Sequence, residues 1–248
     1  MPTDDLGAEV PLADHPRRVV SLVPSLTDAI APLTTLVGAT DYCTHPADLD
    51  VVRIGGSKYP SVDKILALSP DLVVANAEEN RPGDVSDLRD AGVAVWVTEA
   101  PATVPAALES IRRLVTEALG TQVPDWLLEA AELWATPLPH RATAIIPVWR
   151  KPWIVLGRDT FAGDVLLRLG VSNAYAEHSE RYPRPPLSEL VDTEADLVVL
   201  PDEPYEFTAD DGPGFFPGKR PVLVNGRYLT WYGPSLLNAW RTLDAAFR

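Results

Sequence analysis

The sequence predicts an α/β protein made of two Rossmann-like lobes that are joined by a single linking helix. Short apolar runs typical of buried strands alternate with segments of helical periodicity, which is the pattern of mostly parallel sheets. The alternation is interrupted between residues 120 and 142, where one helical segment is stopped by Pro137 and Pro139. We therefore expect an N-terminal α/β lobe over 17–119, a linking helix region over 120–142 and a C-terminal α/β lobe over 143–248.

The N-terminal lobe should begin with a buried strand and a helix that starts at Pro24-Ser25. Ser25 is a plausible N-cap, and Asp28 follows it three residues later as in a capping box. Gly92 and Gly120 close two later helices. Strands are predicted at 18–23, 36–42, 71–75 and 93–98, and further helices at 61–68, 82–91 and 104–119.

The linking helix and the C-terminal lobe follow the same alternation. Pro124 suits the first turn of a helix, so the linking helix is predicted over 124–135. Strands are predicted at 144–148, 153–156, 197–200 and 222–224, and helices at 161–169, 187–191 and 235–247.

The two halves of the chain echo each other at a constant offset of 125 residues. Asp71 begins the run Asp-Leu-Val-Val, which returns at Asp196, and Glu78 has its counterpart in Glu203. This indicates a duplicated architecture, although two α/β units can also share such features by chance. Ligands of open α/β sheets bind beyond the carboxyl ends of strands, so we expect a ligand cleft between the two lobes.

Composition excludes some classes of function. The chain has 35 Asp and Glu against 21 Lys and Arg, a formal net charge of −14, which disfavours nucleic-acid binding. Cys43 is the single cysteine, so no internal disulfide can form. No apolar run approaches the roughly 18 residues of a membrane span, so no membrane insertion is expected. Residues 1–10 lack the basic start and apolar run of a secretory signal, which predicts a cytoplasmic protein as written, or an extracytoplasmic one if a leader has been removed.

Catalytic signatures are missing from the sequence. There is no phosphate-binding glycine loop, no Gly-x-Ser-x-Gly elbow, no paired zinc cysteines and no His-Glu-x-x-His. Cys43 and His45 could contact a ligand, but two such residues do not make a closed metal site, and packing is the alternative. We therefore expect no catalytic residues, no metal site and no cofactor.

Polar and aromatic residues instead gather just after the predicted strands. Flat aromatic side chains suit a large planar ligand, and charged groups can fix its polar rim. Ordinary core packing is the alternative for the tryptophans, and a solvated loop is the alternative for Glu78. The expected ligand-binding residues are Tyr42, His45, Glu78, Trp149, Trp153, Arg158, Arg184, Glu203, Trp231 and Tyr232.

Four segments resemble the N-terminal lobe of the helical-backbone metal receptors, the type III periplasmic substrate-binding proteins. They are RVVSLVPSLTD at 18–28, VGATDY at 37–42, RIGG at 53–56 and ILALSPDLVV at 65–74. The resemblance is closest to the cobalamin-binding branch. It implies a two-lobed receptor for a cobalamin, haem or ferric siderophore. The chain departs from the cobalamin binders where their corrin-packing tryptophans fall, near Ser57 and at Asn76, whereas their tyrosine matches Tyr42.

The resemblance also implies a partner. In importer-coupled members an acid on a short helix of each lobe pairs with arginines of the membrane permease, and the matching residues here are Asp63 and Glu189. Stabilisation of their own helices is the alternative role of these acids. The sequence thus predicts a non-catalytic substrate-binding protein for a bulky metal chelate, a corrinoid before haem or a ferric siderophore, associated with ABC-type import. The rival hypotheses are a cytosolic cofactor-handling enzyme or chaperone and a ligand-free regulatory partner.

Overall fold

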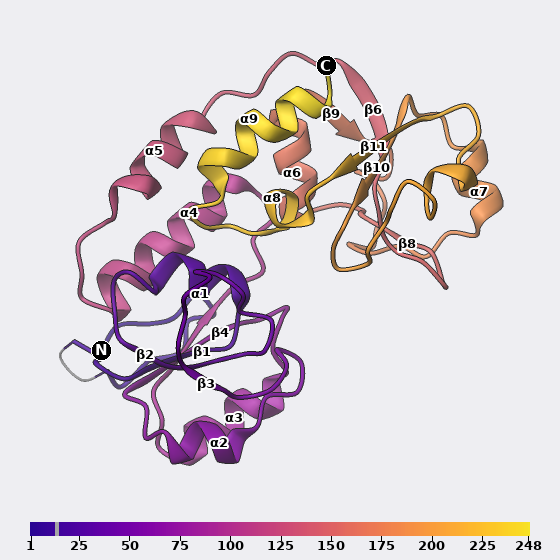
Figure 1. Cartoon of the computed structure of the whole chain (residues 1–248). Helices are drawn as coiled ribbons and strands as arrows, with labels where there is room; N and C mark the ends of the chain where they lie inside the picture. The colour runs from indigo at the N-terminus through magenta and orange to yellow at the C-terminus, as the bar shows by residue number, and fades with distance from the viewer. Residues whose placement is uncertain (13–14) are drawn as a thin grey trace. The chain divides into compact units, whose positions relative to one another are not determined.

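The computed structural model describes residues 1–12 and 15–248, and the chain divides into two compact units (Figure 1). Unit 1 comprises Met1–Ala100, Leu108–Leu128 and Tyr232–Pro234, and unit 2 comprises Pro101–Ala107, Glu129–Trp231 and Ser235–Arg248. The division differs from the bounds expected from the sequence, because unit 1 also takes in the first residues of the chain. The acids of this segment anchor it: the Asp4 carboxylate pairs with Arg89 at 2.7 Å and Asp5 pairs with Arg113 at 2.6 Å.

Unit 1 is built on a five-stranded, fully parallel sheet in the order β3-β2-β1-β4-β5. Its central strands β1 and β4 are short runs rich in branched apolar residues, as expected for a sheet that is covered on both faces; Val19, Val20 and Leu72–Val74 are fully buried. The bounds are β1 Val19–Ser21, β2 Leu36–Ala39, β3 Val52–Arg53, β4 Leu72–Asn76 and β5 Val95–Thr98.

The helices of unit 1 follow the predicted positions with two differences. Pro24 stands at the first turn of α1 and Val23 is its N-cap, so Ser25 lies inside the helix and the predicted capping box is absent. The helix predicted over 104–119 consists of α4 followed by a π-helical turn at Leu114–Ala118. The bounds are α1 Pro24–Ile30, α2 Val62–Ala67, α3 Pro82–Asp90, α4 Val104–Arg113 and α5 Asp125–Leu133. The division into units falls within α4 and α5, so α5 is not the only helix that it crosses.

Unit 2 contains a four-stranded parallel sheet in the order β11-β10-β6-β9 and the antiparallel pair β7-β8. The strand predicted at 144–148 is divided between β6 and β7. Strand β9 was not predicted. The bounds are β6 Ala142–Ile145, β7 Pro147–Trp149, β8 Ile154–Val155, β9 Val171–Asn173, β10 Leu197–Pro201 and β11 Arg220–Val224.

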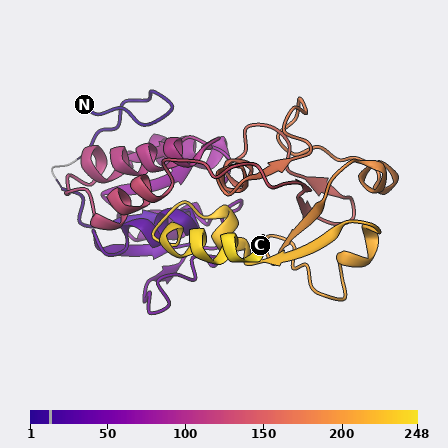
Figure 2. The same ribbon diagram turned by 90° about the horizontal axis from the view of Figure 1, so that it is seen from above.

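Four α-helices and the 3-10 helix Pro213–Phe215 lie in unit 2; the α-helices are α6 Phe161–Arg168, α7 Leu187–Asp192, α8 Gly226–Thr230 and α9 Leu236–Ala246. Figure 1 and Figure 2 both show α8 beside α9. Helix α8 was not predicted; the Asn225 side chain caps it by accepting a hydrogen bond from the backbone N–H of Tyr228.

The sequence echo has a structural counterpart at the start of one central strand in each unit. Asp71 precedes β4, and its carboxylate accepts hydrogen bonds from the backbone N–H groups of Arg17 and Arg18, at 2.9 and 3.1 Å, just before β1. Asp196 precedes β10, and its carboxylate accepts one from Thr143, at 2.8 Å, in the neighbouring strand β6. Each aspartate thus ties the starts of two neighbouring parallel strands together, and this contact is shared by the two sheets.

Candidate functional site

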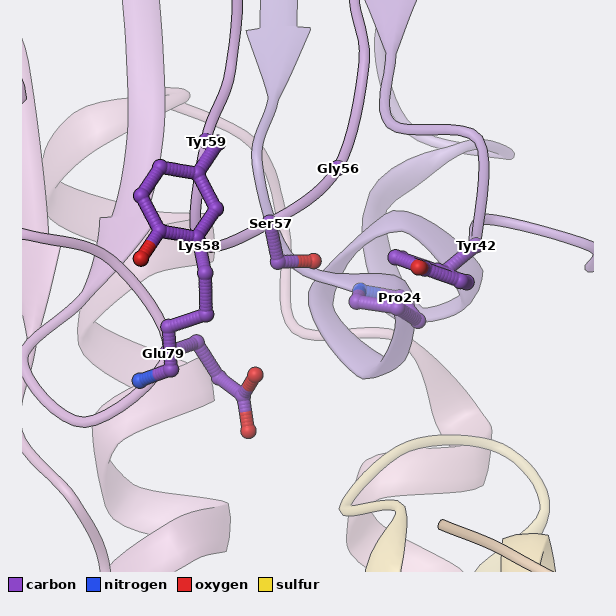
Figure 3. A pocket seen from close by; sticks show the side chains of 7 residues that line it. All are labelled: Pro24, Tyr42, Gly56, Ser57, Lys58, Tyr59 and Glu79. Carbon is purple, nitrogen blue, oxygen red and sulfur yellow. The ribbon is translucent and has the colours of Figure 1, made fainter.

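A pocket of about 380 Å³ lies at the carboxyl edge of the unit 1 sheet (Figure 3). The chain runs from β1 outward through β2 to β3 and then crosses back to β4 and β5, so the strand order reverses between β1 and β4. In open α/β sheets a ligand crevice forms at such a point, because the loops on either side diverge. The lining residues follow four of the strands: Pro24 after β1, Tyr42 after β2, Gly56, Ser57, Lys58 and Tyr59 after β3, and Glu79 after β4.

Two buried asparagines hold the loops of the pocket in place. The Asn76 side chain accepts hydrogen bonds from the backbone N–H groups of Glu78 and Glu79, at 2.9 and 3.2 Å. The Asn80 amide donates to the backbone carbonyls of Ser57 and Leu22, at 2.9 and 3.3 Å, and its oxygen accepts from the backbone N–H of Asn76 at 2.8 Å. The loops after β1, β3 and β4 are therefore tied to one another.

The side chains of Arg53 and Cys43 hold the loop that carries Tyr42 in place. Arg53 donates to the backbone carbonyls of Thr40 and Cys43, at 2.9 and 2.8 Å. The buried Cys43 sulfur accepts from the Thr27 hydroxyl at 3.0 Å and lies 3.1 Å from that of Thr40. Cys43 is thus a packing residue. The predicted ligand-binding residue His45 lies in the same loop, partly buried, with its ring 3.1 Å from the Thr44 hydroxyl.

Two exposed tyrosines flank the pocket. Tyr42 is 66% exposed and Tyr59 is 73% exposed. The Arg81 guanidinium lies 4.6 Å from the centre of the Tyr59 ring, and Asp84 holds Arg81 by a two-point hydrogen bond at 2.9 and 2.6 Å. The positive φ of Gly55, 96°, favours glycine at the turn that leads to this loop. Both rings thus offer an open aromatic face to a ligand.

The carboxylate of Glu79 is the acidic group of the pocket, and Figure 3 shows the Glu79 side chain next to that of Lys58, with the carboxylate turned toward the open space below Ser57. Burial raises its pKa, an effect that the nearby Lys58 ammonium partly offsets by attraction. The Lys58 ammonium itself donates a hydrogen bond to the backbone carbonyl of Glu78. The sequence placed Glu78 in the site, whereas its neighbour Glu79 lines the pocket.

In unit 2 the structure brings Glu203 and Trp231 together. The Trp231 side chain is hydrogen-bonded to the Glu203 carboxylate, and the Arg227 guanidinium lies 5.2 Å from the centre of the Trp231 ring. Burial raises the pKa of Glu203, and the adjacent Asp202 raises it further. These residues follow β10 and α8, so unit 2 also places a carboxylate and an aromatic ring beyond a strand end.

The remaining tryptophans of the predicted site have different environments. Trp153 packs against Phe207, Phe215 and Phe216 in the core of unit 2, with ring centroids 5.3–6.1 Å away, so the alternative of core packing describes it better than an open ligand contact. Trp149 is 42% exposed and meets Tyr205 edge to face at 5.7 Å. Trp149 therefore remains available to a ligand.

The other predicted residues are dispersed. Arg158 is exposed and pairs with its neighbour Asp159 at 2.6 Å, and Arg184 is exposed. Tyr232 is buried, which is unlike an open ligand contact. Asp63 and Glu189 are both exposed in the first turns of α2 and α7, and Glu189 also accepts a hydrogen bond from the Tyr175 hydroxyl at 3.0 Å.

Sequence reasoning missed Pro24, Gly56, Ser57, Lys58, Tyr59 and Glu79 as lining residues. The run Gly55-Gly56-Ser57 followed by Tyr59-Pro60 was the available signal, since glycine, serine and proline together mark a loop. Asn76 falls where the resemblance places a corrin-packing tryptophan, but it is buried, and its amide donates hydrogen bonds to the Thr98 hydroxyl and the Glu99 backbone carbonyl, at 3.0 and 2.7 Å. Among residues 1–12 and 15–248, no cluster of three His, Cys, Asp or Glu could hold a metal ion, and no helix could cross a membrane.

Comparison with known proteins gives one family match, the family described as periplasmic binding protein, over residues 19–212. An uncharacterized ABC transporter substrate-binding lipoprotein of Bacillus subtilis is 27% identical over 71% of this chain and 61% of its own length. The vitamin B12-binding protein of Vibrio cholerae is 24% identical over 70% of this chain and 66% of its own length. Both relatives thus match over less than two thirds of their own length.

A solved structure has a fold similar to that of this chain. The periplasmic haem-binding protein of a Roseiflexus species is 23% identical and superposes with a TM-score of 0.75, over 93% of this chain and 97% of its own. The two-lobed α/β fold predicted from the sequence is confirmed by this similarity. The Bacillus subtilis relative is described as a lipoprotein and the matching family as periplasmic binding protein, so the comparisons do not support the cytoplasmic location predicted from residues 1–10.

Proposed function

This chain belongs to the periplasmic binding protein family, and we propose that it is a non-catalytic substrate-binding protein for a bulky metal chelate, with a corrinoid as the first candidate. Haem and ferric siderophores are the other candidates of the same class. The protein would work outside the cytoplasm and pass its ligand to an ABC-type permease. The relatives named as an ABC transporter substrate-binding lipoprotein and a vitamin B12-binding protein support this assignment.

The observation that carries the proposal is the unit 1 pocket between two exposed tyrosines. A planar chelate exposes two large apolar faces, and rigid aromatic rings cover such faces at a low entropic cost. Tyr59 is held by Arg81 and the loops are held by Asn80, so the aromatic surface exists before a ligand arrives. The pocket is open to solvent, which suits reversible entry and release of a ligand.

Docking to the permease would use Asp63 and Glu189, each exposed at the first turn of a short helix. Carboxylates on a protein surface attract arginines of a partner most strongly when they are not already paired. Asp63 has no ion pair among the residues that the structure describes, whereas Glu189 shares its charge with the Tyr175 hydroxyl. We therefore assign the stronger docking contribution to Asp63.

The test is equilibrium dialysis of the purified protein against cyanocobalamin, haemin and a ferric siderophore, followed by absorbance in the visible range. Each chelate is coloured, so retention and stoichiometry are read directly. Retention of the corrinoid at one molecule per chain is the expected result. Retention of haemin or the siderophore alone would correct the ligand, and retention of none of the three at micromolar concentration would refute the proposal.

A further inference from the structure

The pocket of unit 1 carries a carboxylate that no protein group neutralises by direct contact. No hydrogen bond to the Glu79 side chain is found within the part of the chain that the structure describes, and its carboxylate lines the pocket next to the Lys58 side chain (Figure 3). The basic residue of the pocket is Lys58, and its ammonium donates a hydrogen bond to the backbone carbonyl of Glu78. A ligand that enters the pocket thus meets an acceptor without a donor.

The basic residue next to the pocket does not change this balance. Arg81 stacks on Tyr59, but Asp84 occupies its guanidinium through two hydrogen bonds at 2.9 and 2.6 Å. The charge that Arg81 could offer to an anionic ligand is therefore already matched by a carboxylate. Lys58 attracts Glu79 through space and partly offsets its charge, but within the described residues it makes no hydrogen bond to that carboxylate, in a protein whose formal net charge is −14.

We propose, resting on the function proposed above, that Glu79 is a specificity-determining residue that selects a chelate rimmed with neutral amides over one rimmed with carboxylates. An amide N–H of the ligand donates to the Glu79 carboxylate and satisfies it in a partly desolvated place, where a charge-assisted hydrogen bond is strong. A ligand carboxylate in the same position meets a like charge and leaves both groups without a donor.

Burial of Glu79 is consistent with this role. Burial raises the pKa of the carboxyl group, because the ionised carboxylate is partly desolvated in the protein without ligand. A donor on the ligand offsets that desolvation when it binds. Ser57 lines the same pocket, and its short side chain leaves room for a side group of the ligand to reach the acid.

The experiment compares two corrins that share a ring and a metal and differ only at the rim. Dicyanocobinamide carries amides, and dicyanocobyrinic acid carries carboxylates at the same places. Affinity for each is measured by calorimetric titration at pH 8 and 0.15 M salt, with wild type, Glu79→Gln and Glu79→Ala. Glu99→Gln is the matched control, because it removes one exposed negative charge from the same unit. Circular dichroism verifies that each variant is folded.

Wild type and Glu99→Gln should bind the amide corrin at least about tenfold more tightly than the acid, since a like-charge contact of about 1.4 kcal/mol corresponds to that factor. Glu79→Gln and Glu79→Ala should each reduce this ratio by about tenfold. An unchanged ratio in both Glu79 variants, or equal wild-type affinity for the two corrins, overturns the role of Glu79 and leaves the binding function intact. If no variant binds either corrin, corrinoid binding fails, and this inference fails with it.

Discussion

Asn80 joins three loops of the pocket through one buried side chain, and its replacement by alanine tests whether this junction holds the site. The Asn80→Ala variant loses the donors to the carbonyls of Ser57 and Leu22 and the acceptor for the N–H of Asn76. Each hydrogen bond is worth about 1 kcal/mol net. Because alanine leaves the three backbone groups buried without these partners, we expect the free energy of unfolding to fall by about 3 kcal/mol.

Equilibrium urea unfolding followed by far-UV circular dichroism measures the change. Asn238→Ala is the matched control, because Asn238 is exposed on α9, where alanine is a good helix former and the expected change is within about 0.5 kcal/mol. Hydrogen exchange should also speed up in the loops after β1, β3 and β4 of Asn80→Ala. If Asn80→Ala lowers stability by less than about 1 kcal/mol and exchange in these loops is unchanged, the junction does not hold the site.

Three further predictions concern stability, ligand binding and docking. Glu79→Gln should be more stable than wild type at pH 8, because a raised folded pKa means that stability is lost as pH rises through that pKa; urea unfolding at pH 4 and pH 8 should show the difference disappearing at the lower pH. Trp231→Ala should weaken binding of the retained chelate by roughly 1–3 kcal/mol through lost apolar contact, and an unchanged titration curve would remove Trp231 from the site. The Asp63→Arg, Glu189→Arg double variant should fail to capture the cognate permease in a pull-down that wild type passes, and equal capture would rule out docking through these acids.

Local patterns in the sequence determined most of the elements. A buried parallel strand is a short run of branched apolar residues and a surface helix has a 3.6-residue period, so β1, β4, β10 and most helices could be predicted from neighbouring residues alone. Strands β3 and β9 could not, because two or three residues carry no period and exist as strands only through pairing with β2 and β6.

The unusual termini of helices also depended on contacts outside the local pattern. Pro24 begins α1 directly after β1, which leaves no position for the expected serine cap. The π-helical turn at the end of α4 adds one residue to a turn that the sequence pattern presents as regular helix.

The candidate site shows the same division between local and tertiary information. The sequence placed polar and aromatic residues after strand ends and identified Tyr42, since that information is carried by a few consecutive residues. It could not decide between Glu78 and Glu79, because the choice depends on Asn76, whose side chain binds both backbone amides and orients the loop. Nor could it bring Ser57 and Tyr59 to the pocket, since that requires β3 to pair beside β2 and Asn80 to reach across from the loop after β4. Strand order and long-range hydrogen bonds join residues far apart in the chain, and only the tertiary structure fixes them.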